Sequence, residues 1–177
     1  MTQEKIDIVL REALPEDAGE IIRFLESAAI ETGFLSMGAE GLNISPAEEA
    51  INLERILESE NNILLVALLG DKVIATGSVS ASNKPKLRHI GEIGVAVAKD
   101  YWGFGLGTNL VDELIYWSQE IGIIRRLELT VQARNQRAIH VYQKLGFNEE
   151  AIMPRGVFED GEYLDVCLMS KMIDGID

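Results

Sequence analysis

The stretch Val95-Ala-Val-Ala-Lys-Asp-Tyr-Trp-Gly-Phe-Gly-Leu-Gly-Thr-Asn-Leu110 decides the fold of this chain. It begins with a short apolar run and then carries glycine at every second position, at Gly103, Gly105 and Gly107. Apolar residues then recur at helical spacing, which predicts a strand, a glycine-rich turn and a helix. Backbone N–H groups at the start of such a helix are unpaired and favour phosphate oxygens.

The spacing of these glycines disfavours two common phosphate-binding motifs. The dinucleotide pattern G-x-G-x-x-G requires a glycine where this chain has Thr108, counted from Gly103, or Leu110, counted from Gly105. A nucleoside-triphosphate P-loop ends in a lysine followed by serine or threonine, and no such pair closes this loop. A nicotinamide-dependent oxidoreductase is therefore disfavoured.

Two stretches together resemble a known family. Trp102-Gly-Phe-Gly105-Leu-Gly107 resembles the pyrophosphate loop, Arg/Gln-x-x-Gly-x-Gly/Ala, of the GNAT superfamily of acetyl-CoA-dependent N-acetyltransferases, although Trp102 replaces the usual Arg or Gln. Asn135-Gln-Arg-Ala138-Ile-His-Val-Tyr142-Gln-Lys-Leu145-Gly-Phe147 is similar to the second hallmark, Asn-x-x-Ala-x-x-x-Tyr-x-x-x-Gly-Phe. The matches have the family's order and separation, and with their flanking elements they cover most of the chain.

The resemblance implies a role for individual residues. Tyr142 is the implied general acid for the leaving thiolate, whereas the helical pattern alone makes it a core residue. Glu92 lies near the position where some family members carry a catalytic glutamate, and an exposed strand carboxylate is the alternative. The residues implied in binding acetyl-CoA are Val95, Ala96, Val97, Gly103, Phe104, Gly105, Leu106, Gly107, Thr108, Asn135, Ala138 and Tyr142.

Several of these residues also have a purely structural interpretation. Gly94 fits a bulge or bend that frees neighbouring backbone groups for the pantetheine arm, or it is a simple defect of a buried strand. Asn135 is expected to be the N-cap of its helix as well as a contact of the CoA. Valine at Gly105 or Gly107 is expected to fill the pyrophosphate space and to resist a positive φ.

Composition predicts one soluble globular domain over residues 1–177. The chain has 47% hydrophobic and 25% charged residues, and its net charge of −13 argues against nucleic acid as a partner. An acidic protein is compatible with a cationic amine substrate. The apolar run Ile63–Leu69 is far too short to cross a bilayer, so no membrane segment is expected. No His/Cys/Asp/Glu cluster has the spacing of a metal site.

The single cysteine and the N-terminus indicate the cytoplasm. Cys167 forms no internal disulfide and lies in an alternating strand, where a buried hydrophobe is a better interpretation than a nucleophile. The first five residues, Met-Thr-Gln-Glu-Lys, form no apolar secretory segment. The apolar final strand is expected to pair with another chain's edge, which predicts a homodimer.

Hydrophobic periodicity predicts an α/β fold with a mixed sheet. The resemblance implies that this is a single-domain GNAT-like fold, whose central sheet combines an antiparallel meander with a parallel pair and is flanked by helices. Residues 31–43 are expected to form a loop that walls the substrate side or plugs the core. Strands are expected near residues 6–10, 63–69, 73–80, 89–98, 127–131 and 161–172, and helices over 15–29, 45–59, 106–121 and 135–146.

The expected activity is transfer of an acetyl group from acetyl-CoA to a primary amine of a small molecule, a protein N-terminus or a lysine. Direct attack in a ternary complex is expected, because no Ser/His/Asp arrangement indicates a covalent intermediate. The segment Gly161–Lys171 resembles that of bacterial members near the ribosomal-protein and spermidine acetyltransferases. A non-catalytic acyl-CoA sensor is the alternative.

Overall fold

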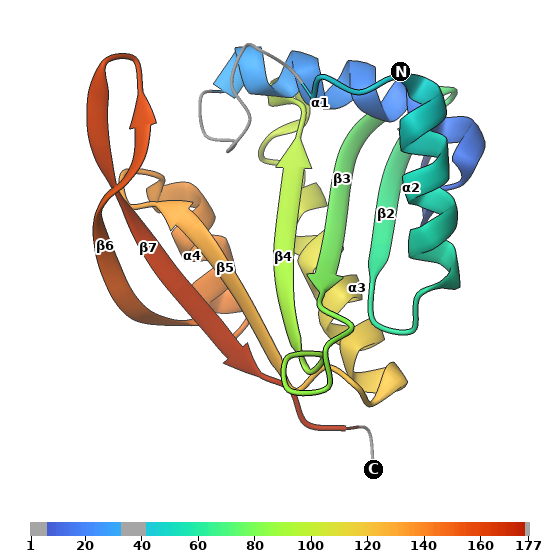
Figure 1. Ribbon diagram of the computed structural model, residues 1–177. Coiled ribbons are helices and arrows are strands. Elements are labelled where there is room, and N and C mark those ends of the chain that lie inside the picture. The colour runs from blue at the N-terminus through green and yellow to red at the C-terminus, as the bar shows by residue number, and fades with distance from the viewer. Residues whose placement is uncertain (1–6, 33–41, 176–177) are drawn as a thin grey trace, which may run out of the picture.

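A computed structural model describes residues 7–32 and 42–175 of the chain. Its seven-stranded sheet has the order β1-β2-β3-β4-β5-β7-β6, and helices pack on both faces (Figure 1). The strands are β1 (Ile8–Glu12), β2 (Ile63–Leu69), β3 (Lys72–Ala81), β4 (Ile90–Val97), β5 (Arg126–Gln132), β6 (Asn148–Glu159) and β7 (Glu162–Met172). The helices are α1 (Ala18–Thr32), α2 (Pro46–Glu58), α3 (Leu106–Ile121) and α4 (Gln136–Lys144), with 3-10 turns at Pro15–Asp17 and Lys99–Tyr101.

The sheet joins two antiparallel parts through one parallel pair. Strands β1 to β4 form an antiparallel meander, and β5, β7 and β6 form a second antiparallel part. Between them β4 and β5 run parallel, because α3 carries the chain back along the sheet before β5 begins. The predicted α/β fold with its meander and parallel pair is confirmed.

The predicted helix signals lie at the observed helix boundaries. Ser45 and Glu48 form a reciprocal capping box at the start of α2, with N–O distances of 3.1 and 2.7 Å. Asn135 caps α4, because its side-chain oxygen accepts a hydrogen bond of 3.2 Å from the Ala138 N–H. Gly146 follows α4 with a φ of 92°, as expected of a residue that ends a helix.

Two cores lie on opposite faces of the sheet. Alternation along β4 directs Ile93 toward the core under α3 and Ala96 toward the core under α1 and α2. The α3 core includes Val79, Leu110, Leu114, Leu127, Leu129 and Phe147, and the α1/α2 core includes Phe24, Leu53, Val66 and Val73. Full burial of one such aliphatic or aromatic side chain contributes about 1.5–3 kcal/mol, so both faces of β4 hold it in place.

Strand β6 was not predicted. It contains Pro154 and Gly156, which are typical of a turn, and its register shifts between Met153 and Val157. Arg155, between Pro154 and Gly156, has a φ of 56°. A proline is tolerated here because β6 lies at the edge of the sheet, where its missing N–H leaves no neighbouring strand unpaired.

The expectation that the final strand offers a free edge to another chain is wrong. The final strand β7 lies inside the sheet between β5 and β6, so it has no free edge for another chain. The sheet edge on this side is β6, which exposes Ile152 and Phe158, and the opposite edge is β1. The homodimer itself stays a prediction. Most of the predicted loop over 31–43 lies outside the described residues, which resume at residue 42.

Candidate active site

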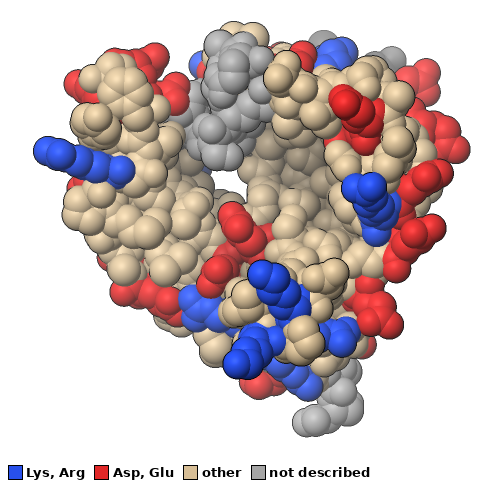
Figure 2. All heavy atoms as spheres, in the orientation of Figure 1, with Lys and Arg blue, Asp and Glu red and all other residues tan. Residues whose placement is uncertain are grey.

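Strands β4 and β5 separate after a short paired segment. Only residues 90–92 of β4 pair with residues 126–128 of β5, although the two strands continue to Val97 and Gln132. Figure 1 shows their C-terminal halves spreading apart. Figure 2 shows the surface hollowed between the two halves of the molecule, with acidic side chains at the lower end of the hollow. This gap is the candidate active site.

The unpaired edge of β4 presents backbone groups to the gap. The Ala98 N–H donates to Ile74 at 2.9 Å, and because bonding alternates along an antiparallel pair, the backbone of Ala96 also points toward β3. The backbone groups of Val95 and Val97 therefore point toward the gap. The predicted bulge at Gly94 is wrong, because this residue pairs with Ser78 in unbroken register. The departure of β5 leaves these groups without a strand partner, and the Val97 carbonyl is bonded by the Trp102 side chain instead.

The glycine-rich loop leads directly into the N-terminus of α3. Gly103 and Gly105 have φ angles of 84° and 82°, a left-handed conformation that side chains disfavour. Gly105 is the N-cap, and no side chain caps the helix, so the N–H groups of the next three residues lack helical partners. A Cβ atom added to Gly105 would meet nothing within 4 Å. The loop thus offers open space beside unpaired donors, which fits a phosphate group.

The remaining residues of this segment, from Phe104 to Thr108, differ in their burial and in their backbone conformation. Gly107 lies inside α3 without a positive φ, and an added Cβ atom would lie 3.8 Å from the Val97 side chain in ordinary contact. The expectation that Gly107 requires a positive φ is therefore wrong. Leu106 is buried in the α3 core, Thr108 is half-buried, and Phe104 directs an exposed ring to solvent.

Two residues beside this loop were not identified from the sequence as site residues. The Trp102 indole N–H donates a hydrogen bond of 2.8 Å to the Val97 carbonyl, so it binds the end of β4. The Arg137 guanidinium carbon lies 5.3 Å from the centre of the Trp102 ring. The signal that points to this pair is the departure of Trp102 from the family pattern, together with a cation one residue before Ala138.

Helix α4 begins beyond the end of β5 and carries Tyr142. Its ring packs against the α3 core and meets Phe147 edge-on, with ring centres 5.7 Å apart. Burial raises the pKa of Tyr142 to about 12, although the residue keeps partial solvent exposure. Tyr142 therefore holds its proton at neutral pH and packs in the core as well, so the two interpretations of the sequence are compatible. Asn135 caps α4 through its oxygen, which leaves its amide N–H₂ group for another partner.

Carboxylates gather where β4 and β5 part. Glu92 is exposed in the last β4–β5 pair, opposite Glu128. Arg126 contacts Glu128 at 2.9 Å and Glu150 at 2.6 Å. Hydrogen bonds from Arg126 and then Ser170 lower the pKa of Glu150 to about 2. Within the described ranges, Glu92 has no ion pair, which leaves its charge uncompensated at the end of the gap.

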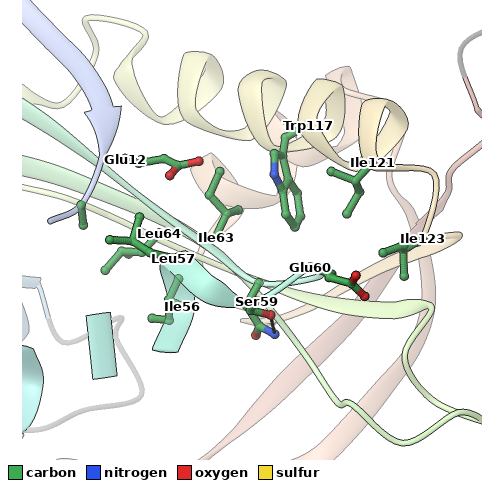
Figure 3. A pocket seen from close by; sticks show the side chains of 12 residues that line it. Glu12, Ile56, Leu57, Ser59, Glu60, Ile63, Leu64, Trp117, Ile121 and Ile123 are labelled. Atoms are coloured by element: carbon green, nitrogen blue, oxygen red, sulfur yellow. Dashed lines mark hydrogen bonds between the residues drawn. The ribbon is translucent and has the colours of Figure 1, made fainter. Parts of the chain in front are cut away.

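A separate pocket lies at the sheet edge where β1 ends. Its volume is about 400 Å³, and its walls come from the ends of α2 and α3 and the start of β2. Figure 3 shows the Trp117 indole and the Ile63 side chain directed into this space. None of the predicted site residues lines it, so it is distinct from the β4–β5 gap.

The described residues hold no group of three or more His, Cys, Asp or Glu side chains suited to a metal ion. No helix among residues 7–32 and 42–175 has the length and apolar character needed to cross a membrane. Cys167 is buried in the α3 core, and burial raises the pKa of its thiol. Its interpretation as a buried hydrophobe is confirmed.

Curated N-acetyltransferases match parts of the chain. It is 28% identical over 119 residues to the L-amino acid N-acetyltransferase AaaT of Escherichia coli K12, a match over 67% of this chain and 74% of the relative. It is 30% identical over 78 residues to spermidine N(1)-acetyltransferase of Escherichia coli K12, covering 44% of this chain. The second match spans only 42% of that relative.

Solved structures match nearly the whole chain. A GNAT-family acetyltransferase from Streptococcus pneumoniae is 41% identical with a TM-score of 0.92, covering 94% of this chain and 99% of that one. A GNAT phosphinothricin acetyltransferase from Sinorhizobium meliloti, solved with acetyl-CoA, is 22% identical with a TM-score of 0.79, covering 94% and 89%, and shares the fold. The profile of the Acetyltransferase (GNAT) family matches residues 23–147. The gap, the glycine loop and these matches agree, and the chain belongs to the GNAT family of acyltransferases.

Proposed function

We propose that this protein transfers an acetyl group from acetyl-CoA to a primary amine at the end of the β4–β5 gap. The observation that carries this proposal is the position of the gap. It lies between an uncapped helix N-terminus preceded by Gly105, which suits a pyrophosphate, and the uncompensated carboxylate Glu92, which suits an amine. The end of the cleft at the start of α3 thus favours an anion, and the end at Glu92 favours a cation.

The proposed reaction is a direct transfer in a ternary complex. Glu92 accepts a proton from the ammonium group, directly or through a water molecule. The neutral amine attacks the thioester carbonyl and forms the C–N bond, while the Val95 N–H, directed into the gap, stabilises the oxyanion. The C–S bond then breaks, and Tyr142 donates its proton to the sulfur. The new C–N nitrogen gives up its remaining extra proton to the Tyr142 phenolate through water, and Glu92 releases its own proton to solvent.

The charges around Glu92, where the amine is proposed to bind, favour an amine that carries further positive charge and no adjacent carboxylate. Arg126 is held by Glu128 and Glu150, so it is engaged rather than available to bind a substrate carboxylate. The spermidine relative is named for a polyamine and the AaaT relative for an amino acid. The acidic end of this gap fits the polyamine better.

A panel of amines with acetyl-CoA tests the proposed function. Free thiol is measured as it is released with spermidine, a simple diamine, an L-amino acid or a peptide with a free N-terminus. We expect amine-dependent release, with kcat/KM highest for the diamine or polyamine. Tight CoA binding without release for any amine would instead favour the sensor, and faster release with the amino acid would contradict the charge argument.

Glu92→Gln is expected to lower kcat/KM for the amine by at least about tenfold at neutral pH, because a general base is lost. An alkyl ammonium has a pKa of about 10.4, so the defect should shrink as the pH rises toward that value and the amine deprotonates unaided. The pH profile of kcat/KM measures this. Glu128→Gln is the matched control, since it removes a neighbouring charge that is already paired. A defect of equal size at all pH values would assign Glu92 to binding alone.

A further inference from the structure

Arg137 places a cation directly over the glycine-rich loop. It is an exposed residue in the first turn of α4, and its guanidinium carbon lies 5.3 Å from the centre of the Trp102 ring. A Cβ atom added to Gly103 would lie 3.2 Å from one of its terminal nitrogens. The side chain of one helix thus reaches the loop that begins another helix, where an added side-chain atom would crowd it.

The guanidinium is held in place by stacking alone. In the described part of the chain, no hydrogen bond or ion pair is found for Arg137, whereas Arg11, Arg23, Arg88 and Arg126 each pair with a carboxylate. The chain has a net charge of −13, and this cation lies at the glycine loop, which leads into helix N–H groups that lack helical partners. Its planar donors remain available for an anion with several oxygens.

We infer that Arg137 binds the pyrophosphate of CoA, and that Trp102 is the platform that holds the guanidinium over the loop. The inference rests on the proposed function, since it requires CoA to lie along this loop. Trp102 carries no charge of its own, and its indole N–H is already used by the Val97 carbonyl. That bond fixes the ring to the end of β4, and the fixed ring in turn orients the guanidinium by a cation–π contact.

Calorimetry with three ligands tests this role. Arg137→Gln is compared with the wild-type protein for CoA, for 3′-dephospho-CoA and for pantetheine, which lacks all phosphates. Loss of a charged hydrogen-bonding partner should weaken binding of CoA and of 3′-dephospho-CoA alike, by about ten- to a hundredfold, and leave pantetheine unchanged. Arg55→Gln, on the exposed side of α2, is the control for the change in net charge.

The outcomes separate this inference from the proposed function. If the wild-type protein binds no CoA, both fail. If the wild-type protein binds CoA and Arg137→Gln binds it equally well, only the role of Arg137 is overturned. A loss confined to CoA and absent with 3′-dephospho-CoA also overturns the inference, because it places the guanidinium on the 3′-phosphate.

A double-mutant cycle tests the platform role of Trp102. Trp102→Leu removes the aromatic face and is expected to weaken CoA binding several-fold in the wild-type background, but to add nothing in the Arg137→Gln background. Trp102→Phe keeps an aromatic face but loses the N–H bond that fixes the ring, so its CoA affinity is expected to lie between those of the wild type and Trp102→Leu. If Trp102→Leu weakens CoA binding equally in both backgrounds, Trp102 affects CoA binding only by holding the loop or the end of β4, and not by orienting Arg137.

Discussion

Gly105→Val is expected to weaken CoA binding by at least about a hundredfold while the chain remains folded. A β-branched residue with a φ near 82° is strained by about 1–2 kcal/mol, which a domain of this size tolerates. An added Cβ atom meets nothing within 4 Å, so the new side chain points into the open space beside the N–H groups of α3. Each charge-assisted hydrogen bond lost there is worth about 1.5–3 kcal/mol, and two of them account for the expected change.

Gly122→Val is the matched control for this substitution. Gly122 ends the same helix with a φ of 68°, and an added Cβ atom there would also meet nothing within 4 Å. Both variants should lose similar thermal stability, whereas calorimetry should find a loss of CoA affinity only for Gly105→Val. Equal CoA affinity in the two folded variants would show that the glycine loop does not bind the pyrophosphate.

Tyr142→Phe is expected to lower kcat by about a hundredfold and to leave the KM for acetyl-CoA nearly unchanged. A general acid contributes about 10²–10⁴ in rate. We expect the lower end, because burial raises the pKa of Tyr142 to about 12, well above that of an ordinary thiol. Proton transfer to a free thiolate is therefore uphill. The ring remains, so no cavity forms and the midpoint of thermal unfolding should hardly change.

The raised pKa also predicts the alkaline behaviour of the enzyme. Because the hydroxyl keeps its proton until the pH approaches 12, deprotonation of Tyr142 should cause no fall in kcat below about pH 11. Tyr116→Phe, at an exposed position of α3, is the control. Pre-steady-state measurements should first show that product release does not limit kcat. A kcat within a few-fold of wild type would leave Tyr142 as a packing residue, with water as the proton donor.

Most of the fold could be predicted because its signals are local. The Ser45 capping box, the Asn135 cap and the Gly146 terminus each depend on residues within a few positions of one another. The glycine loop is of the same kind, since the φ angles of Gly103 and Gly105 follow from its own sequence.

The features that were missed depend on distant parts of the chain. Strand β6 tolerates Pro154 only because no strand lies beyond it, which the local sequence does not reveal. The backbone groups of β4 that lack a strand partner result from the point at which β5 leaves the pairing. The local sequence instead suggested a bulge at Gly94, because it does not show where β5 departs. The Arg137–Trp102 contact joins α4 to the loop before α3, and neither segment alone predicts it.

Single-turnover transfer from acetyl-CoA labelled in its acetyl group tests the central claim most directly. Enzyme, labelled acetyl-CoA and the best amine of the panel are mixed and quenched at short times, and the label on protein and amine is measured by mass spectrometry. We predict that the label passes to the amine nitrogen at the rate at which free thiol appears, with none on the protein. Label that accumulates first on the protein, or that stays on CoA with every amine, would contradict direct acetyl transfer in the β4–β5 gap.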